Sequence, residues 1–199
     1  MFVQVIRGKV KDANALRSAD EQWKKDIKPG AKGYLGSTSG VADDGTAVVL
    51  ARFDSEDSAR ANSNRAEQGK WWNDVASKVF DSEPTFFDST DVELFRNGGS
   101  DDAGFVQVMV GKADDVAKYK EFSKSMESRM AELRPDVIGG VSAFAPDGRF
   151  YDFTYFASEA EAREGEKKEM PADIQDAMKE WGNPIQEYID LRDPWFDSA

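Results

Sequence analysis

The side chains that could do chemistry in this 199-residue chain are carboxylates, Lys, Arg, Tyr, Asn and Gln, because it contains no Cys and no His. Without Cys there is no thiol nucleophile, disulfide or thiolate metal site. Without His the chain lacks the commonest general base, the commonest transition-metal ligand and the usual haem ligand. We therefore expect no cofactor, no bound metal and no Ser-His-Asp hydrolase, so that any reaction uses the remaining side chains or the substrate itself.

Composition narrows the classes of partner. Two carboxylates could do acid and base work, but a chain with 38 acidic residues selects no particular pair by count. The glycines form neither a phosphate loop nor a dinucleotide fingerprint. A net charge of −12 repels nucleic acid and anionic lipid, and no segment reads as a signal peptide or an apolar run of roughly 20 residues. We expect a cytoplasmic protein with no nucleic-acid or membrane partner.

The chain repeats itself at an offset of 103 residues. Phe2-Val3-Gln4-Val5 returns as Phe105-Val106-Gln107-Val108, and the same offset carries the run from Phe53 to Arg60 onto that from Phe156 to Arg163. A period of this length is the size of a small domain rather than of a solenoid unit. The sequence predicts a first repeat over residues 1–97, a linker over 98–103 and a second repeat over 104–199.

Each repeat shows the same order of element signals. A strand, residues 2–7 or 105–110, precedes an amphipathic helix, which Asp114-Asp115 opens in the second copy. A hairpin at Asp44-Gly45 or Asp147-Gly148 follows, and then a helix capped by Ser55 or Ser158. In the second copy the apolar stripe of the first helix steps through Val116, Tyr119, Phe122, Met126 and Met130. The order β-α-β-β-α-β, twice, predicts two ferredoxin-like α+β repeats.

The ends of the two repeats carry the weakest signals. Residues 85–95 are expected to be partly strand and 184–191 to close the second copy. Aligning Val92 with Ile189 gives an offset of 97, so the second copy is expected to have lost about six residues. A ferredoxin-like sheet leaves one face bare, which predicts that the two sheets pack into an intramolecular dimeric α+β barrel, with a monomer favoured. The tail from Asp190 to Phe196 is expected to fold back as a lid or a structural strap.

These features resemble the antibiotic biosynthesis monooxygenase-like group of the dimeric α+β barrel superfamily. The resemblance rests on the two FVQV openings, the Asp44-Gly45 hairpin and the run from Phe53 through Trp71-Trp72, and it covers nearly the whole chain. It implies a cofactor-independent monooxygenase acting on small aromatic or polycyclic phenolic substrates. Such a reaction needs a dry aromatic slot and a donor that stabilises the substrate phenolate. The alternative is a non-catalytic small-molecule-binding or stress-associated protein of the same fold.

The resemblance also points to a site in the first repeat. It implies catalytic roles for Asn64, Trp72 and Arg52, and a substrate-binding set of Asn62, Trp71, Gln68, Phe87 and Tyr155. The second repeat places Lys167 opposite Asn64 and has no adjacent Trp pair, so the first repeat is the better candidate. Each position also has a structural interpretation: either Trp can pack as ordinary core, Arg52 can reach solvent at a strand end, and the cluster from Asn62 to Arg65 can be a helix cap and turn.

Overall fold

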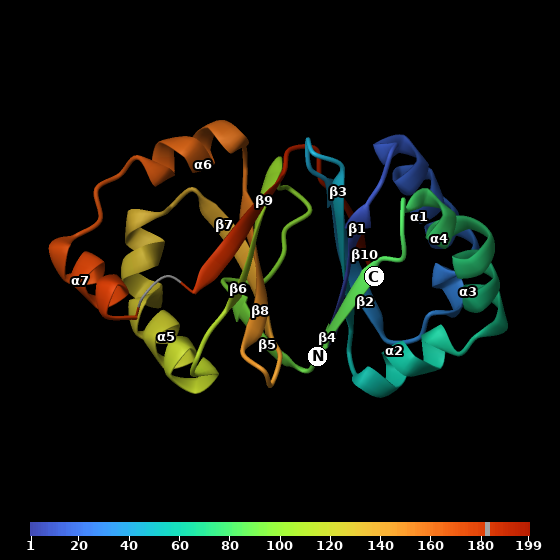
Figure 1. Cartoon of the computed structure of the whole chain (residues 1–199), viewed down its shortest axis with the longest axis horizontal. Coiled ribbons are helices and arrows are strands. Elements are labelled where there is room, and N and C mark those ends of the chain that lie inside the picture. Colours follow the sequence, from blue (N-terminus) through green and yellow to red (C-terminus); the bar gives the residue numbers. More distant parts are fainter. Residues whose placement is uncertain (182–183) are drawn as a thin grey trace. The chain divides into compact units, whose positions relative to one another are not determined.

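Each half of the chain is a five-stranded antiparallel sheet with helices along one face, in a computed structural model that describes residues 1–181 and 184–199 (Figure 1). The first unit comprises Met1–Val92 and Asp193–Ala199, and the second comprises Glu93–Arg192. This is the predicted fold class of two ferredoxin-like repeats, while the pairing of the two sheets into one barrel stays a prediction. No helix within the described residues is both long and apolar enough to cross a membrane.

The first unit has the sheet order β10-β2-β3-β1-β4. Its strands are β1 (Phe2–Lys9), β2 (Tyr34–Val41), β3 (Thr46–Phe53), β4 (Thr85–Ser89) and β10 (Trp195–Ser198). Its helical segments are α1 (Ala13–Asp26), the 3₁₀ turn η1 (Lys28–Gly30), α2 (Glu56–Ser63), α3 (Ala66–Trp71), the π-helical turn η2 (Trp72–Ala76) and α4 (Ser77–Val79).

The second unit has the equivalent sheet order β5-β7-β8-β6-β9. Its strands are β5 (Asp91–Phe95), β6 (Phe105–Lys112), β7 (Val137–Phe144), β8 (Arg149–Phe156) and β9 (Ile185–Leu191). Its helices are α5 (Val116–Leu133), α6 (Glu159–Glu166) and α7 (Ala172–Trp181). The elements β6, α5, β7, β8 and α6 each begin 103 residues after β1, α1, β2, β3 and α2, so the sequence repeat is a repeat of structure.

The last strand of each repeat belongs to the sheet of the other unit. β5 follows β4 in the chain but hydrogen-bonds to β7, and β10 follows β9 but pairs with β2, with Trp195 opposite Ser39. The predicted strand over 85–95 is therefore two strands in two sheets. The C-terminal tail is an edge strand, which agrees with the strap and not with a lid. The predicted domain limits describe the duplication in sequence and stay predictions.

The register of the closing strands corrects the predicted alignment. Phe87 lies opposite Val5 in the first sheet, and Ile189 lies opposite Val108 in the second. Because Val5 and Val108 are repeat equivalents, Phe87 corresponds to Ile189, an offset of 102 and not 97. The expected loss of about six residues was wrong because residues 85–95 were treated as one strand.

Local signals account for the element boundaries. Ser55 Oγ accepts the backbone N–H of Ser58 at 3.2 Å at the start of α2, and Ser158 caps α6 in the same way. Asp115 caps α5, as its position in the sequence predicted. Gly45 and Gly148 have φ angles of 81° and 89°, which only glycine adopts at low cost, so both hairpin predictions are confirmed.

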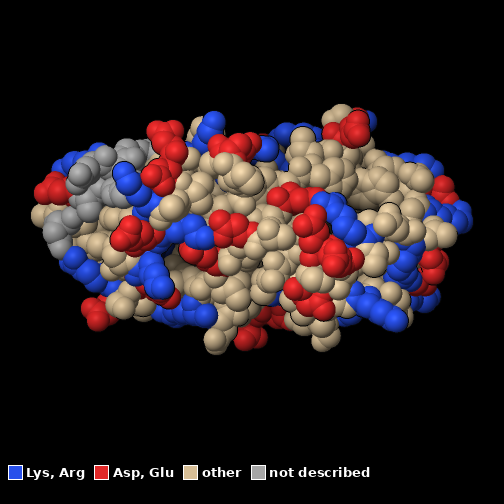
Figure 2. All heavy atoms as spheres, turned by 90° about the horizontal axis from the view of Figure 1, so that it is seen from below, with Lys and Arg blue, Asp and Glu red and all other residues tan. Residues whose placement is uncertain are grey.

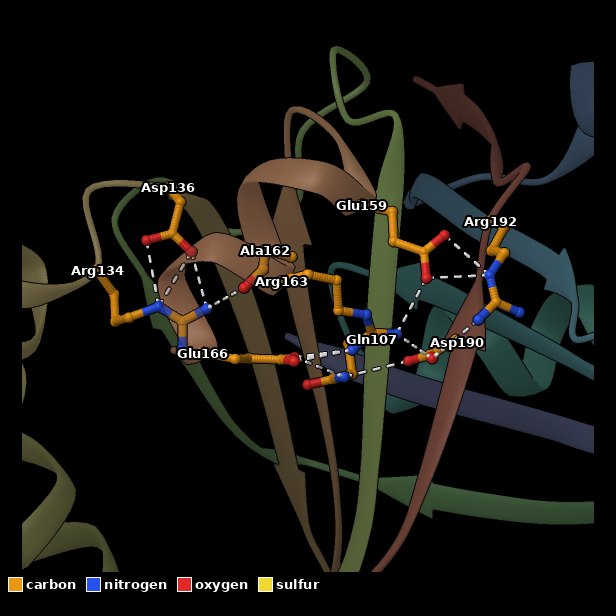
Figure 3. A network of polar contacts seen from close by, with 9 residues as sticks. All are labelled: Gln107, Arg134, Asp136, Glu159, Ala162, Arg163, Glu166, Asp190 and Arg192. Atoms are coloured by element: carbon orange, nitrogen blue, oxygen red, sulfur yellow. Dashed lines mark hydrogen bonds and ion pairs between the residues drawn. The ribbon is translucent and has the colours of Figure 1, made fainter. Parts of the chain in front are cut away.

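The residues shared by both repeats form a polar network between strands and helix (Figure 3). In the second unit the Gln107 amide donates to Asp190 at 3.1 Å, and Arg163 pairs with Asp190 and, at 3.1 Å, with Glu159. Arg192 also contacts Glu159, at 2.9 Å. The network therefore fixes α6 to β6 and β9.

The first unit repeats the core of this network. Gln4 donates to Asp88 at 2.8 Å, and Arg60 pairs with Asp88 at 2.8 Å and with Glu56 at 3.2 Å. Because the pairs are largely exposed, each adds little stability, but together they hold α2 against β1 and β4. The repeated Gln, Glu and Arg of the sequence are thus explained as scaffold.

Acidic and basic side chains are interspersed on the face drawn in Figure 2, and no continuous basic stripe crosses it. The net charge of −12 is therefore spread rather than gathered on this face. A nucleic-acid surface would need a basic stripe, and this face has none.

Candidate functional site

A cavity of about 330 Å³ lies in the first unit between the sheet and its helices. Val49, Ala51 and Phe53 of β3 form part of its floor, so this is the helix-covered face of the sheet. α1 and the segment from α2 to η2 supply the walls. Aromatic rings dominate the lining: Phe2, Trp23, Tyr34, Phe53, Trp71, Trp72 and Phe86.

The adjacent tryptophans both reach this cavity. Trp71 ends α3 and Trp72 begins the π-helical turn η2, and their ring centroids are 6.3 Å apart with planes inclined at 56°. Trp72 also lies 5.4 Å from the exposed ring of Phe86 on β4. Turns of this kind are frequent at functional sites. Here the turn begins at Trp72, directly after Trp71 at the end of α3, and so it carries the second of the two indoles.

A chain of hydrogen bonds fixes the orientation of Gln68. The indole N–H of Trp23 donates to Gln68 Oε1 at 2.7 Å, and Asn62 Nδ2 donates to the same oxygen at 3.3 Å. Arg65 Nη1 holds Asn62 from the other side by donating to its Oδ1 at 3.0 Å. Because an indole N–H can only donate, the Gln68 oxygen must face Trp23. The Gln68 amide nitrogen is therefore left without a partner among the described residues.

A second donor is also unused. Trp71 Nε1 is buried and has no hydrogen-bond partner among the described residues. A buried N–H without a partner costs about 1–3 kcal/mol, so such a group calls for an explanation. A ligand oxygen in the cavity that Trp71 lines would satisfy it.

A partly buried acid, Asp20 on α1, lines the same cavity. Its side chain is 16% exposed, and Lys24 Nζ lies 3.0 Å from Oδ2. Burial raises the pKa of the Asp20 carboxyl, and the nearby Lys24 ammonium only partly opposes this shift. A carboxylate with a raised pKa at the edge of an aromatic cavity is a candidate base.

Tyr34 on β2 lies close to this acid. Burial raises the pKa of the Tyr34 hydroxyl, and the charges of Asp197 and Asp20 add to the shift. Asp197, on the returning strand β10, is held by Lys28 Nζ at 2.8 Å. The Tyr34 hydroxyl therefore stays protonated and can act only as a neutral hydrogen-bonding group.

The structure brings four of the sequence-predicted residues together, namely Asn62, Gln68, Trp71 and Trp72. Asn64 is not among them, because it is the exposed C-terminal cap of α2 and its backbone N–H bonds to Arg60 O at 3.0 Å. Asn64 therefore has the structural role that the sequence offered as the alternative, a helix cap within the cluster from Asn62 to Arg65.

Three predicted strand residues lie away from the cavity because side chains alternate between sheet faces. Arg52 lies between Ala51 and Phe53, which line the cavity, and so belongs to the opposite face of β3. Phe86 lines the cavity from β4, so its neighbour Phe87 points to the other face of that sheet. Tyr155 is in the second unit, on β8, fully buried on the face away from the helices.

The sequence interpretation missed Asp20, Trp23 and Tyr34. Asp20 and Trp23 are three residues apart on α1 and therefore share one helix face, a signal that the sequence does contain. Among residues 1–181 and 184–199 no group of three acidic side chains is arranged to hold a metal ion.

The fold and the cavity define a class: tandem ferredoxin-like α+β proteins with a pocket between sheet and helices. No family model and no curated protein matches the chain. Several solved structures, however, match the chain in fold. A candidate monooxygenase from Fusobacterium nucleatum aligns with a TM-score of 0.74 at 11% identity, over 100% of this chain and 94% of that one.

Two further solved structures cover the chain as fully. An anthrone oxidase-like protein aligns with a TM-score of 0.69 at 10% identity, over 100% of this chain and 93% of that one. A ferredoxin-fold protein from Listeria monocytogenes, related to antibiotic biosynthesis monooxygenases, gives 0.53 at 10% identity, over 96% and 94%. At these identities the likeness is one of fold, and it extends to the tandem arrangement.

Proposed function

We propose that the first unit is a cofactor-independent monooxygenase for small aromatic phenols or their keto tautomers. The observation that carries this proposal is one aromatic cavity lined by a partly buried acid, Asp20, and by Trp71, whose buried indole N–H has no hydrogen-bond partner among the described residues. A base that removes a substrate proton and a donor that holds the resulting oxyanion are the two groups that such chemistry requires.

The proposed reaction needs no group beyond substrate and oxygen. Asp20 removes a proton from the activated CH₂ of an anthrone-type substrate, and the charge moves onto the substrate oxygen. Trp71 Nε1 and the Gln68 amide donate hydrogen bonds to that oxygen. The carbanion reduces O₂, so that one oxygen atom becomes the new carbonyl and the other leaves as water: R₂CH₂ + O₂ → R₂C=O + H₂O.

The size of the cavity limits the substrate. Its volume of about 330 Å³ is at the lower end of the roughly 300–1,000 Å³ common for ligand pockets. Two or three fused rings fit this space better than a tetracyclic compound does. Rings of Trp72 and Phe86 supply faces against which a planar substrate can stack.

Oxygen uptake by the purified, metal-free protein tests the proposal, with anthrones, naphthols and hydroquinones as the panel. Asp20→Asn should lower kcat by about 10²–10⁴-fold, because it removes the base but not the shape. Trp72→Ala should raise KM and lower turnover by opening the wall. Arg52→Lys, on the other face of β3, is the control and should turn over normally. Uptake that Asp20→Asn leaves unchanged would contradict the proposed mechanism.

A binding protein without turnover is the second candidate. Three of the five tryptophans, Trp23, Trp71 and Trp72, line the cavity, so its occupation should quench intrinsic fluorescence. Saturable quenching without oxygen uptake or product would favour this candidate over the enzyme.

A further inference from the structure

The second unit holds its own cavity, of about 520 Å³, between its sheet and helix α5. The apolar stripe that the sequence predicted on this helix supplies one wall through Tyr119, Phe122, Met126 and Met130. Phe144 of β7 meets the Tyr119 ring edge-on, with ring centroids 6.1 Å apart and planes inclined at 63°. The lining is therefore aromatic and thioether-rich, and it lacks the tryptophan pair of the first cavity.

One carboxylate, that of Asp152 on β8, lies on the floor of this cavity. Ser142 Oγ donates to its Oδ2 at 3.0 Å, and Thr154 Oγ1 donates to its Oδ1 at 3.1 Å. The residue is half-buried, and it lines the cavity. Two hydroxyl bonds use only part of the acceptor capacity of a carboxylate. No ion pair of the described residues involves Asp152, so its charge has no counter-charge there.

None of the other charged residues that the structure describes in the lining supplies this counter-charge. Lys124 and Glu127 are exposed and lie at the rim. Arg134 is held by Asp136 at 2.8 Å, and Glu93 pairs with Lys120 at 3.2 Å, outside the lining. The floor of the cavity therefore carries an uncompensated acid in a chain whose net charge is already −12.

The duplication makes this acid informative. At the 103-residue offset Asp152 corresponds to Val49, and both line their own cavity. Conversely, Asp20 of the first cavity corresponds to Ser123 of the second. The acid of the first cavity lies 3.0 Å from Lys24 Nζ, whereas that of the second has no such partner in the described part of the chain. The acids of the two cavities thus stand at different positions, and only that of the first cavity is paired with a described cation. This difference predicts that the two cavities bind ligands of different charge.

We propose that the second cavity binds a hydrophobic amine, whose protonated nitrogen donates to Asp152 and whose apolar body packs against Tyr119, Phe122 and the methionines of α5. The cation supplies the counter-charge that the floor lacks, and charge-assisted hydrogen bonds of this kind are the strong ones. This site is independent of the oxygenase proposed for the first unit. Burial raises the pKa of Asp152, as expected for a carboxyl awaiting such a partner.

Calorimetric titration of the full chain at pH 7 with two matched probes tests this proposal. 1-Naphthylmethylamine carries the cation, and 1-naphthylmethanol has the same ring system without charge. The amine should bind at least about tenfold more tightly than the alcohol, the fold-change expected for one hydrogen bond between charged groups. This comparison uses the unaltered protein and depends on no variant.

Two variants then locate the site. Asp152→Asn, which keeps the size of the side chain, should weaken amine binding at least about tenfold and leave alcohol binding within about twofold. Asp20→Asn, in the first cavity, should leave amine binding unchanged. Equal affinities for amine and alcohol, no amine binding at millimolar concentration, or loss of amine binding in Asp20→Asn instead of Asp152→Asn would each overturn the proposal.

Discussion

Replacing Trp71 by Phe should change activity and stability in opposite directions. The substitution removes a buried indole N–H that has no hydrogen-bond partner in the part of the chain that the structure describes, and it keeps an aromatic ring in the wall. Relief of the unsatisfied donor favours the folded state by about 1–3 kcal/mol, and the smaller ring offsets roughly 1 kcal/mol of this through poorer packing. The free energy of unfolding should therefore rise by about 0–2 kcal/mol. Turnover should fall by about 10²–10³-fold, the usual effect of losing one oxyanion donor.

Trp195→Phe provides the matched control, because Trp195 Nε1 is also buried with no hydrogen-bond partner in residues 1–181 and 184–199, but Trp195 does not line the cavity. Urea denaturation measures stability, and oxygen uptake measures turnover, for both variants. Trp195→Phe should share the effect on stability and keep full activity. If Trp71→Phe keeps full turnover, or if both variants lose it equally, the assignment of the Trp71 N–H as the oxyanion donor is refuted.

Three further predictions follow from the same contacts. The kcat/KM of the proposed oxygenase reaction should fall on the acid side at a pH above the ordinary Asp value of 3.8, because burial raises the pKa of Asp20, and a pH–rate profile checks this. Burial raises the pKa of Asp152, so the folded state binds the carboxyl proton more tightly than the unfolded state does, and the free energy of unfolding should fall as pH rises from 3.8 through the raised pKa. Asp152→Asn should abolish this part of the pH dependence, which urea denaturation at several pH values measures. Deleting residues 193–199 should cost at least about 3 kcal/mol, seen as a lower urea midpoint, because the four residues of β10 that pair with β2 are lost together with the packing of Trp195.

Local signals in the sequence predicted the elements well because each depends on few neighbours. The caps Ser55 and Ser158 and the hairpin glycines Gly45 and Gly148 act within a turn of chain, and all four are where the sequence indicated. Because the sequence repeats after 103 residues, the strands and helices predicted in one repeat were also predicted in the other. Among the candidate site residues, the same locality brought Asn62, Gln68, Trp71 and Trp72 to one cavity.

The failures concern relations between distant segments. Arg52 and Phe87 were assigned to the cavity, but the sequence does not show which alternate set of side chains on β3 and β4 faces the helices. An error of one residue places a side chain on the opposite face of the sheet. Asp20 was hidden among 38 acidic residues, and only the packing of α1 on the sheet distinguishes it. The departure of β5 to the other sheet leaves no local mark, because a strand carries no signal of which edge it will join.

The exchange of strands also sets the order in which the protein can be completed during synthesis. The outer edge of β2 pairs with β10, whose first residue is made 154 residues after β2 ends at Val41. At about 5–20 residues per second the nascent chain carries that edge unpaired for roughly 10–30 s. Exposed edges invite aggregation, and β2 is suited to the wait: it reads YLGSTSGV, poor in large apolar residues, and its register shifts between Tyr34 and Gly36. The low apolar content of this strand is therefore expected to limit aggregation at its edge until β10 has been made.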